Sequence, residues 1–240
     1  MLDPAILPCI LLLNSTQDLN RTMSMLPAKA FYLIRHGETH ANINQISAGG
    51  GLESDLSEFG INQAKALAAV ITTLDIKPSH IYHSPMRRAT DTATYINEHL
   101  GLPMTKLDDF EEHRFGEWEG LHWDEVLPNV RANVRPAGGE NRDDFAKRIK
   151  RVLGTALESH KDEAPPMFVA HGGTFWGIMD GHKWAYEGNI KNCHLHYFDP
   201  EPAHGHFPWK VCQFDVNSDA LERQNASFCP RTWPHQTQHK

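Results

Sequence analysis

A histidine and an arginine stand together directly after a short apolar run near the start of the chain. The run Phe31-Tyr32-Leu33-Ile34 is typical of a buried strand, and the pentapeptide Arg35-His36-Gly37-Glu38-Thr39 follows it. In open α/β sheets, ligands bind at the carboxyl ends of the strands. A histidine beside a guanidinium is poorly suited to being a resting cation, and well suited to attacking an anion that the arginine holds. The pair therefore suggests phosphoryl transfer through histidine.

Two further predicted strands end in side chains of the same kind. Ser79 to His83 is expected to form a strand, and Ser84-Pro85-Met86-Arg87-Arg88-Ala89 follows it. Met167 to Ala170 is expected to form another, and His171-Gly172-Gly173 follows it. Because the carboxyl ends of neighbouring parallel strands open on one crevice, we expect two imidazoles and at least two guanidiniums to converge there. Such a pocket suits phosphoryl transfer, since arginine holds phosphate oxygens through a fork that does not deprotonate.

Phosphoryl transfer also requires a group that protonates the leaving oxygen. A carboxyl among apolar or anionic neighbours suits this role, because such surroundings favour its protonated form. The segment from Phe110 to Gly120 places several acids among aromatic residues. The residue types alone do not choose among the four candidates, which are Glu111, Glu112, Glu117 and Glu119.

The intervening segments predict the elements that position these groups. Apolar residues at helical spacing predict a helix capped by Ser57, a helix that starts at Ser84-Pro85, and an amphipathic helix across Phe145 to Leu157. Short apolar strands alternate with these helices, and two late strands, near Leu195 to Phe198 and Trp209 to Phe214, complete the core. We therefore predict a three-layer α/β fold, with a mainly parallel central sheet covered by helices on both faces.

The composition narrows the classes of partner. The 240 residues carry a net charge of -7 and are 40% hydrophobic, which is ordinary for a globular protein. The acidic balance argues against a nucleic-acid binder, since that class presents a basic surface. An anion site in this chain is therefore expected to be a local positive pocket. No apolar run reaches the length of a membrane span, so we expect no membrane partner.

Cysteine and histidine usage favours a reduced protein without a metal. The cysteines are widely spaced, form no disulfide framework and fit the cytoplasm; they are Cys9, Cys193, Cys212 and Cys229. The 16 histidines are scattered, with no HExxH or Cys-x-x-Cys grouping, so we expect no metal site. The apolar run Ile6 to Leu13 is interrupted by Pro8 and preceded by Asp3 instead of a basic segment, so we do not expect a signal peptide.

Four motifs in this order resemble those of the histidine phosphatase superfamily, also called the phosphoglycerate mutase-like family. They are Arg-His-Gly-Glu-Thr at 35–39, Ser-Pro-x-x-Arg-Ala-x-x-Thr-Ala at 84–93, Glu-x-x-Phe-Gly-x-Trp-Glu-Gly at 112–120 and His-Gly-Gly-Thr at 171–174. One short motif is weak evidence, but four in the right order and structural context are strong. The resemblance covers most of the chain, from about Phe31 to Phe214, and it implies the fold predicted above.

The resemblance implies a role for each matched residue. His36 would be the nucleophile that becomes phosphorylated, and Glu112 the general acid that later activates water as a base. Arg35, Arg88 and His171 would complete the phosphate pocket. The residues that would contact the substrate are Thr39, Asn42 and Gly172. The family needs no metal, and no other cofactor is expected.

Several neighbouring residues are expected to have structural roles. Arg87 is expected to be solvated on its helix face, with its stem packed. Glu117 and Glu119 are expected to be loop or surface acids. The role of His113 stays open, because it lies beside the proposed acid and could line the pocket. Asn192-Cys193 is typical of a turn that enters a strand, with Cys193 as a small buried apolar group.

The chain departs from the mutases of this family in three places. The 58 residues between Glu112 and His171 hold no extended insert of the kind that cofactor-dependent mutases carry. Ile46 to Leu52 replaces an aromatic stretch containing Gly-Trp, and its three glycines suggest a mobile rim. Gly138-Gly139-Glu140-Asn141 replaces Gly-Gly-Glu-Ser or Gly-Gly-Glu-Thr, which puts substrate contacts through a hydroxyl in doubt.

These departures favour a metal-independent phosphomonoesterase that hydrolyses a small phosphorylated metabolite through a phosphohistidine on His36. The alternatives are phosphoryl transfer of the phosphoglycerate mutase type and a catalytically weak member that binds a phosphorylated ligand. We expect residues 1–28 to form an extension outside the core, residues 29–217 the histidine phosphatase domain, and residues 218–240 a polar tail. The sequence leaves the substrate, the true start codon and the oligomeric state open, and a homodimer is one alternative.

Overall fold

The computed structural model describes residues 26–182, 184–185, 190–201, 207–217, 220–222, 227–228 and 231–232. Most of the predicted N-terminal extension and C-terminal tail lies outside the described residues. Leu26, near the end of the predicted extension, is buried in the hydrophobic core. The core therefore begins slightly before the boundary that the sequence suggested.

The centre of the molecule is a mixed sheet with the strand order β3-β2-β4-β1-β6-β7-β8, and β9 pairs with β7. The parallel strands are β1 (Phe31–Arg35), β2 (His80–His83), β3 (Met104–Lys106) and β4 (Pro166–Ala170). The antiparallel strands are β6 (Leu195–Pro200), β7 (Trp209–Asn217), β8 (Ala220–Glu222) and β9 (Ser227–Phe228). The short strands β5 (Trp184–Ala185) and β10 (Arg231–Thr232) pair separately. The predicted α/β class is confirmed, and the late strands add an antiparallel part to the sheet.

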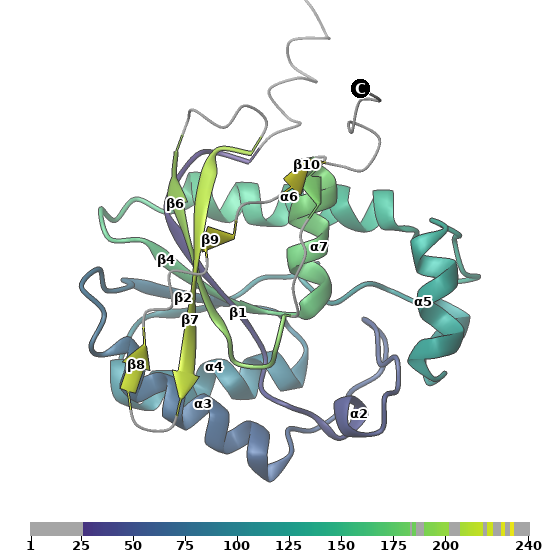
Figure 1. The fold of residues 1–240 in the computed structure, drawn as a ribbon, viewed down its shortest axis with the longest axis horizontal. Helices are drawn as coiled ribbons and strands as arrows, with labels where there is room; N and C mark the ends of the chain where they lie inside the picture. The colour runs from purple at the N-terminus through teal and green to yellow at the C-terminus, as the bar shows by residue number, and fades with distance from the viewer. Residues whose placement is uncertain are drawn as a thin grey trace, which may run out of the picture.

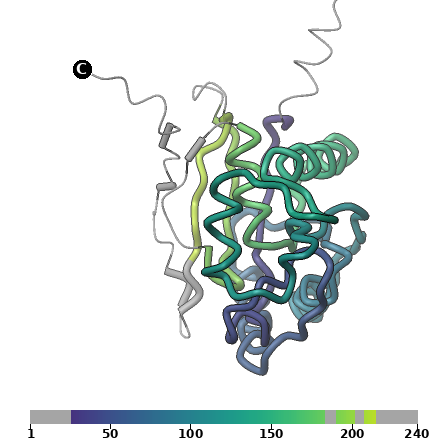
Figure 2. The backbone as a smooth tube through the Cα atoms, turned by 90° about the vertical axis from the view of Figure 1, so that its right-hand side faces the viewer, coloured from purple at the N-terminus to yellow at the C-terminus, as the bar shows by residue number. Residues whose placement is uncertain are grey.

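Helices cover both faces of the sheet, as predicted (Figures 1 and 2). The helices are α2 (His40–Ile43), α3 (Glu58–Ile71), α4 (Arg87–Leu100), α5 (Trp123–Arg131), α6 (Arg142–Ser159) and α7 (Gly172–Gly181), with a 3-10 turn η1 (Gly116–Trp118). Figure 1 shows α6 and α7 on one side of the sheet, α3 and α4 on the other, and α2 and α5 set off to the right. None of the described helices combines the length and the apolar character that a bilayer span requires.

The side chains of β1 point alternately to the two faces of the sheet and contribute to the hydrophobic core on both. Phe31 and Leu33 pack in the cluster that contains the apolar residues of α6 and α7. Tyr32 and Ile34 pack in the cluster that contains those of α3 and α4. Successive side chains of a strand point to opposite faces, so four buried residues in a row place β1 between the two layers. The position at which the chain leaves this strand is therefore well determined.

The predicted helix starts agree with the structure at one position and differ at another. Ser57 caps α3, because its hydroxyl accepts a hydrogen bond from the Gly60 backbone N–H at 3.0 Å. However, α4 begins at Arg87 with Met86 at its N-cap position, and the predicted start at Ser84-Pro85 is wrong. The Ser84 hydroxyl hydrogen-bonds the His171 ring instead, at 2.7 Å from Nε2.

Candidate functional site

The sheet brings the three predicted strand ends to one edge. β4 pairs with β1 and with β2, and Ala170 lies opposite Arg35. The segments beyond the strands continue this pairing, because the His36 N–H donates to the Ala170 carbonyl at 2.9 Å. As a result, the His36 and His171 rings lie 5.3 Å apart between centroids, at an interplanar angle of 63°. Two histidines that lie 135 positions apart in the sequence thus share one small buried site.

A backbone contact of the His36 ring determines which of its nitrogens carries the hydrogen. Its Nδ1 lies 2.7 Å from the Gly37 carbonyl oxygen, which can only accept a hydrogen bond. In the neutral ring, Nδ1 therefore carries the hydrogen and Nε2 the free lone pair. Burial, and then the positive charges of Arg88 and Arg35, hold the His36 pKa well below its ordinary value. The resting ring is consequently neutral and able to attack an electrophile.

Two residues that the sequence analysis missed hold the His36 loop in place. The Thr92 hydroxyl accepts from the Gly37 N–H at 3.0 Å. The Asn192 side-chain amide donates to the His36 carbonyl at 2.8 Å and to the Asn42 side-chain oxygen at 3.1 Å. Gly37 itself packs closely, since a Cβ there would lie 2.6 Å from the Gly60 carbonyl oxygen. Thr92 lies within the quoted Ser-Pro motif, whereas a turn prediction at Asn192 did not indicate this role.

Two buried nitrogen atoms at the site have no hydrogen-bond partner within the described residues: Arg35 Nε and His171 Nδ1. The Arg35 guanidinium is held on its other side, because Nη1 donates to the Ile190 carbonyl at 2.6 Å. We assign the His171 tautomer in which Nε2 accepts a hydrogen bond from the Ser84 hydroxyl. In this tautomer the ring hydrogen is on Nδ1, so Nδ1 is a donor. Buried donors are normally satisfied, so this pair fits an anion that binds beside His36.

Gly172 keeps the space beside Arg35 open. A Cβ on Gly172 would stand 3.5 Å from Arg35 Nε, so any longer side chain would approach the unpartnered nitrogen. The backbone at this position also starts α7, and the first N–H groups of a helix favour anions. The contact with the substrate that we expect for Gly172 stays a prediction.

Arg88 is buried and joins the site to the rim formed by Ala48 to Leu52. Its guanidinium donates to the Gly49 carbonyl at 2.7 Å and to the Leu52 carbonyl at 3.1 Å. Burial lowers the pKa of Arg88 and that of Arg35, and the nearby Glu112 carboxylate opposes this effect on both. Arg35 and Arg88 are thus two desolvated guanidiniums that share the Glu112 carboxylate as a neighbour. In contrast, the Arg87 side chain is 59% exposed, which agrees with its predicted solvation, and it pairs with Asp55 on the surface.

The three glycines of the rim reflect close packing. A Cβ at Gly49 would lie 2.7 Å from the Glu119 carboxylate, and one at Gly50 would lie 2.7 Å from the Glu112 carbonyl oxygen. Glu119 also accepts from the Gly51 N–H at 2.9 Å. The sequence suggested a mobile rim, whereas the structure shows a loop that is anchored at several points. Glu119, which we expected to be a loop or surface acid, is one of its anchors.

Glu112 is the acid of the four candidates that reaches the strand-end site. Its Oε2 accepts from the Gly173 N–H at 2.9 Å, in the first turn of α7, and its Oε1 accepts from the His113 N–H at 2.8 Å. A Cβ at Gly173 would overlap the carboxylate, which explains the second glycine of His-Gly-Gly. Glu111 instead pairs with Arg114 at 3.1 Å. The structure therefore places the Glu112 carboxylate at the start of α7, close to the Arg35 and Arg88 guanidiniums.

Thr39 and Asn42 form a hydrogen-bonded cap at the start of α2. The Thr39 hydroxyl accepts from the Asn42 N–H, and the Asn42 side-chain oxygen accepts from the Thr39 N–H, both at 3.2 Å. Thr39 is buried in this arrangement. The contacts occupy the oxygen of the Asn42 amide and leave its NH₂ group for other partners, so the substrate-binding roles expected for both residues stay predictions.

Ligands for a metal do not gather here. In the part of the chain that the structure describes, no three histidine, cysteine, aspartate or glutamate side chains form a cluster that could hold a metal ion. Cys193 is buried as predicted, and burial raises the pKa of its thiol to about 12, so it stays protonated. The donors at the site are nitrogen atoms that suit an oxyanion.

Acidification should destabilise the protein through His36. At this position the unfolded chain takes up a proton near pH 6.5 and the folded chain does not. Protonation of the unfolded chain therefore lowers the free energy of unfolding as the pH falls below 6.5, and it has no effect well above this pH. We expect the free energy of unfolding of wild type, minus that of His36→Gln, to fall by up to about 1.4 kcal/mol per pH unit below this point. Urea unfolding across this range in phosphate-free buffer measures the difference. A difference that does not change with pH would contradict a neutral, buried His36.

Known proteins that resemble this chain in sequence or structure include several phosphatases. The family model described as "Histidine phosphatase superfamily (branch 1)" matches residues 31–204. The "Putative phosphoserine phosphatase 2" of Hydrogenobacter thermophilus is 35% identical over 162 residues, which cover 63% of this chain and 77% of the relative. The "Metal-independent phosphoserine phosphatase" of Arabidopsis thaliana is 33% identical over 161 residues, covering 61% and 65%. A mycobacterial glucosyl-3-phosphoglycerate phosphatase, solved with VO3, matches with a TM-score of 0.62 at 26% identity, covering 83% of this chain and all of the other.

Proposed function

We propose that this chain, which belongs to the histidine phosphatase superfamily (branch 1), hydrolyses a small phosphorylated metabolite through a phosphohistidine intermediate on His36. That the chain is a phosphatase follows from the family and from its relatives; the intermediate and the residue roles are the proposal. The observation that carries it is a neutral histidine with a free Nε2, buried beside two unpartnered donors and a second desolvated guanidinium.

In the first step, the lone pair of His36 Nε2 attacks phosphorus and forms a P–N bond. The bond between phosphorus and the ester oxygen breaks, and Glu112 gives a proton to that oxygen, so the alcohol leaves neutral. Arg35, Arg88 and His171 hold the phosphoryl oxygens. Phosphoryl transfer gains mainly from such positioning and from stabilisation of the charge on these oxygens.

In the second step, water replaces the histidine. Glu112, now a carboxylate, takes a proton from a water molecule as its oxygen attacks phosphorus. The P–N bond breaks and its electron pair returns to Nε2, which restores the neutral ring and releases inorganic phosphate. One carboxyl therefore serves first as acid and then as base, and its contact with the Gly173 N–H keeps it at the start of α7.

The substrate class follows from the pocket and from the relatives. The site offers nitrogen donors for a phosphoryl group, and the relatives are named for phosphoserine and for glucosyl-3-phosphoglycerate. We therefore expect a small alkyl phosphate of a polar metabolite. The short interval between Glu112 and His171 favours a phosphatase over a mutase. A cytoplasmic location and a homodimer stay predictions from the sequence.

A screen of phosphate esters tests the proposed function. We expect hydrolysis of p-nitrophenyl phosphate and of at least one alkyl phosphate of the panel, with rates unchanged by excess EDTA, because nitrogen donors rather than a metal hold the phosphate. Phosphoserine and phosphoglycerates belong in the panel. Interconversion of phosphoglycerates that depends on 2,3-bisphosphoglycerate would indicate a mutase instead. No turnover of any ester would favour a protein that only binds a phosphorylated ligand.

A further inference from the structure

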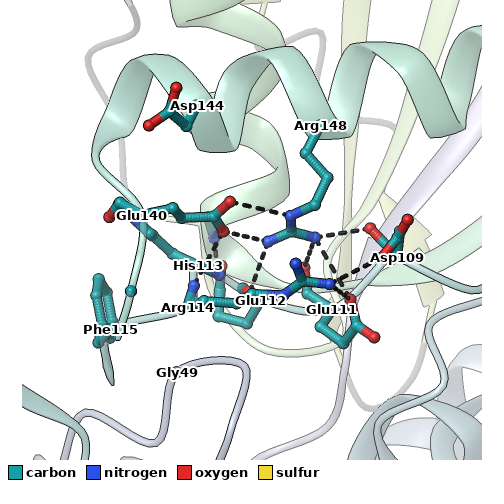
Figure 3. Close-up of polar contacts among 12 residues, drawn as sticks. Gly49, Asp109, Glu111, Glu112, His113, Arg114, Phe115, Glu140, Asp144 and Arg148 are labelled. Atoms are coloured by element: carbon teal, nitrogen blue, oxygen red, sulfur yellow. Dashed lines mark hydrogen bonds and ion pairs between the residues drawn. The ribbon is translucent and has the colours of Figure 1, made fainter. Parts of the chain in front are cut away.

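A buried arginine lies behind the loop that carries Glu112. Arg148 extends from α6 toward residues 109–114, where Figure 3 shows its guanidinium among the polar groups of this loop. Nη1 donates to the carbonyls of Asp109 and Glu111, at 2.7 and 3.0 Å. Nη2 donates to the carbonyl of Glu112 itself, at 3.0 Å. One side chain thus binds three backbone carbonyls within four residues.

The loop needs such a brace because its backbone is not regular. Asp109 adopts φ of 62°, a left-handed conformation that is uncommon outside glycine and that aspartate takes more readily than most other residues. Backbone of this kind persists where its surroundings determine it strongly. The loop carbonyls point toward α6. The Arg148 guanidinium donates hydrogen bonds to three of them at once, in a fixed planar geometry that the ammonium group of a lysine does not provide.

Glu140 holds the guanidinium from the opposite side. Its Oε2 accepts from Arg148 Nε at 3.1 Å, and its Oε1 pairs with Arg148 Nη2. The same carboxylate accepts from the Arg114 N–H at 3.1 Å, and the Glu140 carbonyl accepts from His113 Nε2 at 2.8 Å. The His113 ring stacks on Phe145, at an interplanar angle of 3°. Both members of the pair are buried.

We propose that the buried Arg148–Glu140 pair positions Glu112 for proton transfer. The pair holds the loop through its backbone, and Arg148 also pairs with the Glu111 carboxylate at 3.5 Å. Both residues would therefore act on the chemistry through the position of Glu112 and not through a contact with the substrate. With the loop held, the Glu112 carboxylate stays within hydrogen-bond distance of the Gly173 N–H and close to the Arg35 and Arg88 guanidiniums. This inference rests on the proposed role of Glu112 as general acid.

A purely structural role is the alternative, since breaking a buried ion pair is strongly destabilising in general. The two roles differ in a ratio of rates. The value of kcat/KM covers the steps up to departure of the leaving group. p-Nitrophenolate scarcely needs a proton in order to leave, whereas an alkoxide does. A misplaced acid therefore slows alkyl phosphates selectively, while partial unfolding slows both kinds of ester by the same factor.

Arg148→Lys is the test variant, because lysine keeps the charge near Glu140 and loses the fork. We expect kcat/KM to fall by at least about 10-fold for the best alkyl phosphate and by less than about 3-fold for p-nitrophenyl phosphate. The matched control is Arg151→Lys on the same helix, where an exposed arginine pairs with the Asp109 carboxylate at 2.9 Å. This control should leave the ratio of the two kcat/KM values unchanged.

A second substitution shows whether Arg148 acts through Glu112. Glu112→Gln alone should change the same ratio by more than Arg148→Lys does, because glutamine has no acidic proton. In the Glu112→Gln background, Arg148→Lys should change the ratio no further, since interacting residues are not additive. A further change of the ratio in that background, or an equal loss for both esters in the wild-type background, overturns the positioning role.

The outcomes separate this inference from the proposed function. If wild type hydrolyses neither ester, the proposed function itself fails. If wild type hydrolyses both esters and Arg148→Lys leaves the ratio unchanged, only the positioning role fails. Should Arg148→Lys show no cooperative unfolding transition, Glu140→Gln decides by the same ratio, because glutamine keeps an oxygen that accepts from the guanidinium. An unchanged ratio in that variant also overturns the inference.

Discussion

Replacing His36 with alanine is expected to abolish hydrolysis, with kcat/KM for p-nitrophenyl phosphate falling by at least about 10⁴-fold. The variant has no nitrogen to accept the phosphoryl group, so the two-step route through a P–N bond is closed. We expect the remaining donors still to bind phosphate, because Arg35 and Arg88 are anchored by carbonyls that do not belong to His36. The loss should therefore appear in kcat far more than in KM.

The measurement combines steady-state rates with acid and alkaline quenching of wild type during turnover. A phosphohistidine should survive alkali and be lost in acid, and it should be missing from His36→Ala. His40→Ala is the matched control, since His40 is an exposed histidine four positions away, and its rate should stay within about 2-fold of wild type, as for most surface substitutions. If His36→Ala keeps more than about 1% of wild-type kcat/KM, another nucleophile or direct attack by water carries the reaction.

The direction of the late strands could have been predicted from the sequence and was not. The apolar pattern locates a strand without giving its direction. Connection length carries that information, because parallel neighbours need a crossover of about a dozen residues or more. Only residues 201–208 separate β6 from β7, which is too short for such a crossover. The parallel part was predicted correctly because helices visibly separate β1, β2 and β4.

The candidate site divides into side chains that the sequence indicates and side chains that it does not. Arg35 is the last residue of an apolar strand, and His36 and His171 directly follow such strands, so their convergence could be deduced from the rule on strand ends. Arg148 and Asn192 act on backbone carbonyls of segments 36 or more positions away. No local pattern marks such contacts, since any polar residue on a helix or turn is ordinarily solvated.

Glycine-rich segments illustrate a second limit. A run of glycines is compatible with mobility and also with close approach of neighbouring groups. At Gly49 to Gly51 the structure shows close approach, to Glu119 on one side and to the Glu112 loop on the other. Whether a glycine run is mobile or closely packed depends on the residues that pack against it, and here those residues lie about 60 positions away in the sequence.

Replacing Arg88 is expected to have the second largest effect, because Arg88 combines two tasks. Its guanidinium holds the rim through the carbonyls of Gly49 and Leu52, and it lies close enough to lower the pKa of both His36 and His171. We expect Arg88→Ala to lower kcat/KM by about 10³-fold or more, the scale of an arginine that stabilises a transferring phosphoryl group. Arg88→Lys should still lose at least about 10²-fold, since a single ammonium does not replace the fork.

The neighbouring arginine provides the matched control for charge and position. Arg87 has an exposed side chain and pairs with Asp55 at 2.6 Å and Asp91 at 3.8 Å, so Arg87→Lys should stay within about 2-fold of wild type. Steady-state rates with p-nitrophenyl phosphate and inhibition by inorganic phosphate are measured for all three variants. Weaker inhibition by phosphate should accompany the loss of rate at Arg88 only. Equal rates for Arg88→Lys and Arg87→Lys would show that net charge alone, and not a guanidinium held by the rim, serves the site.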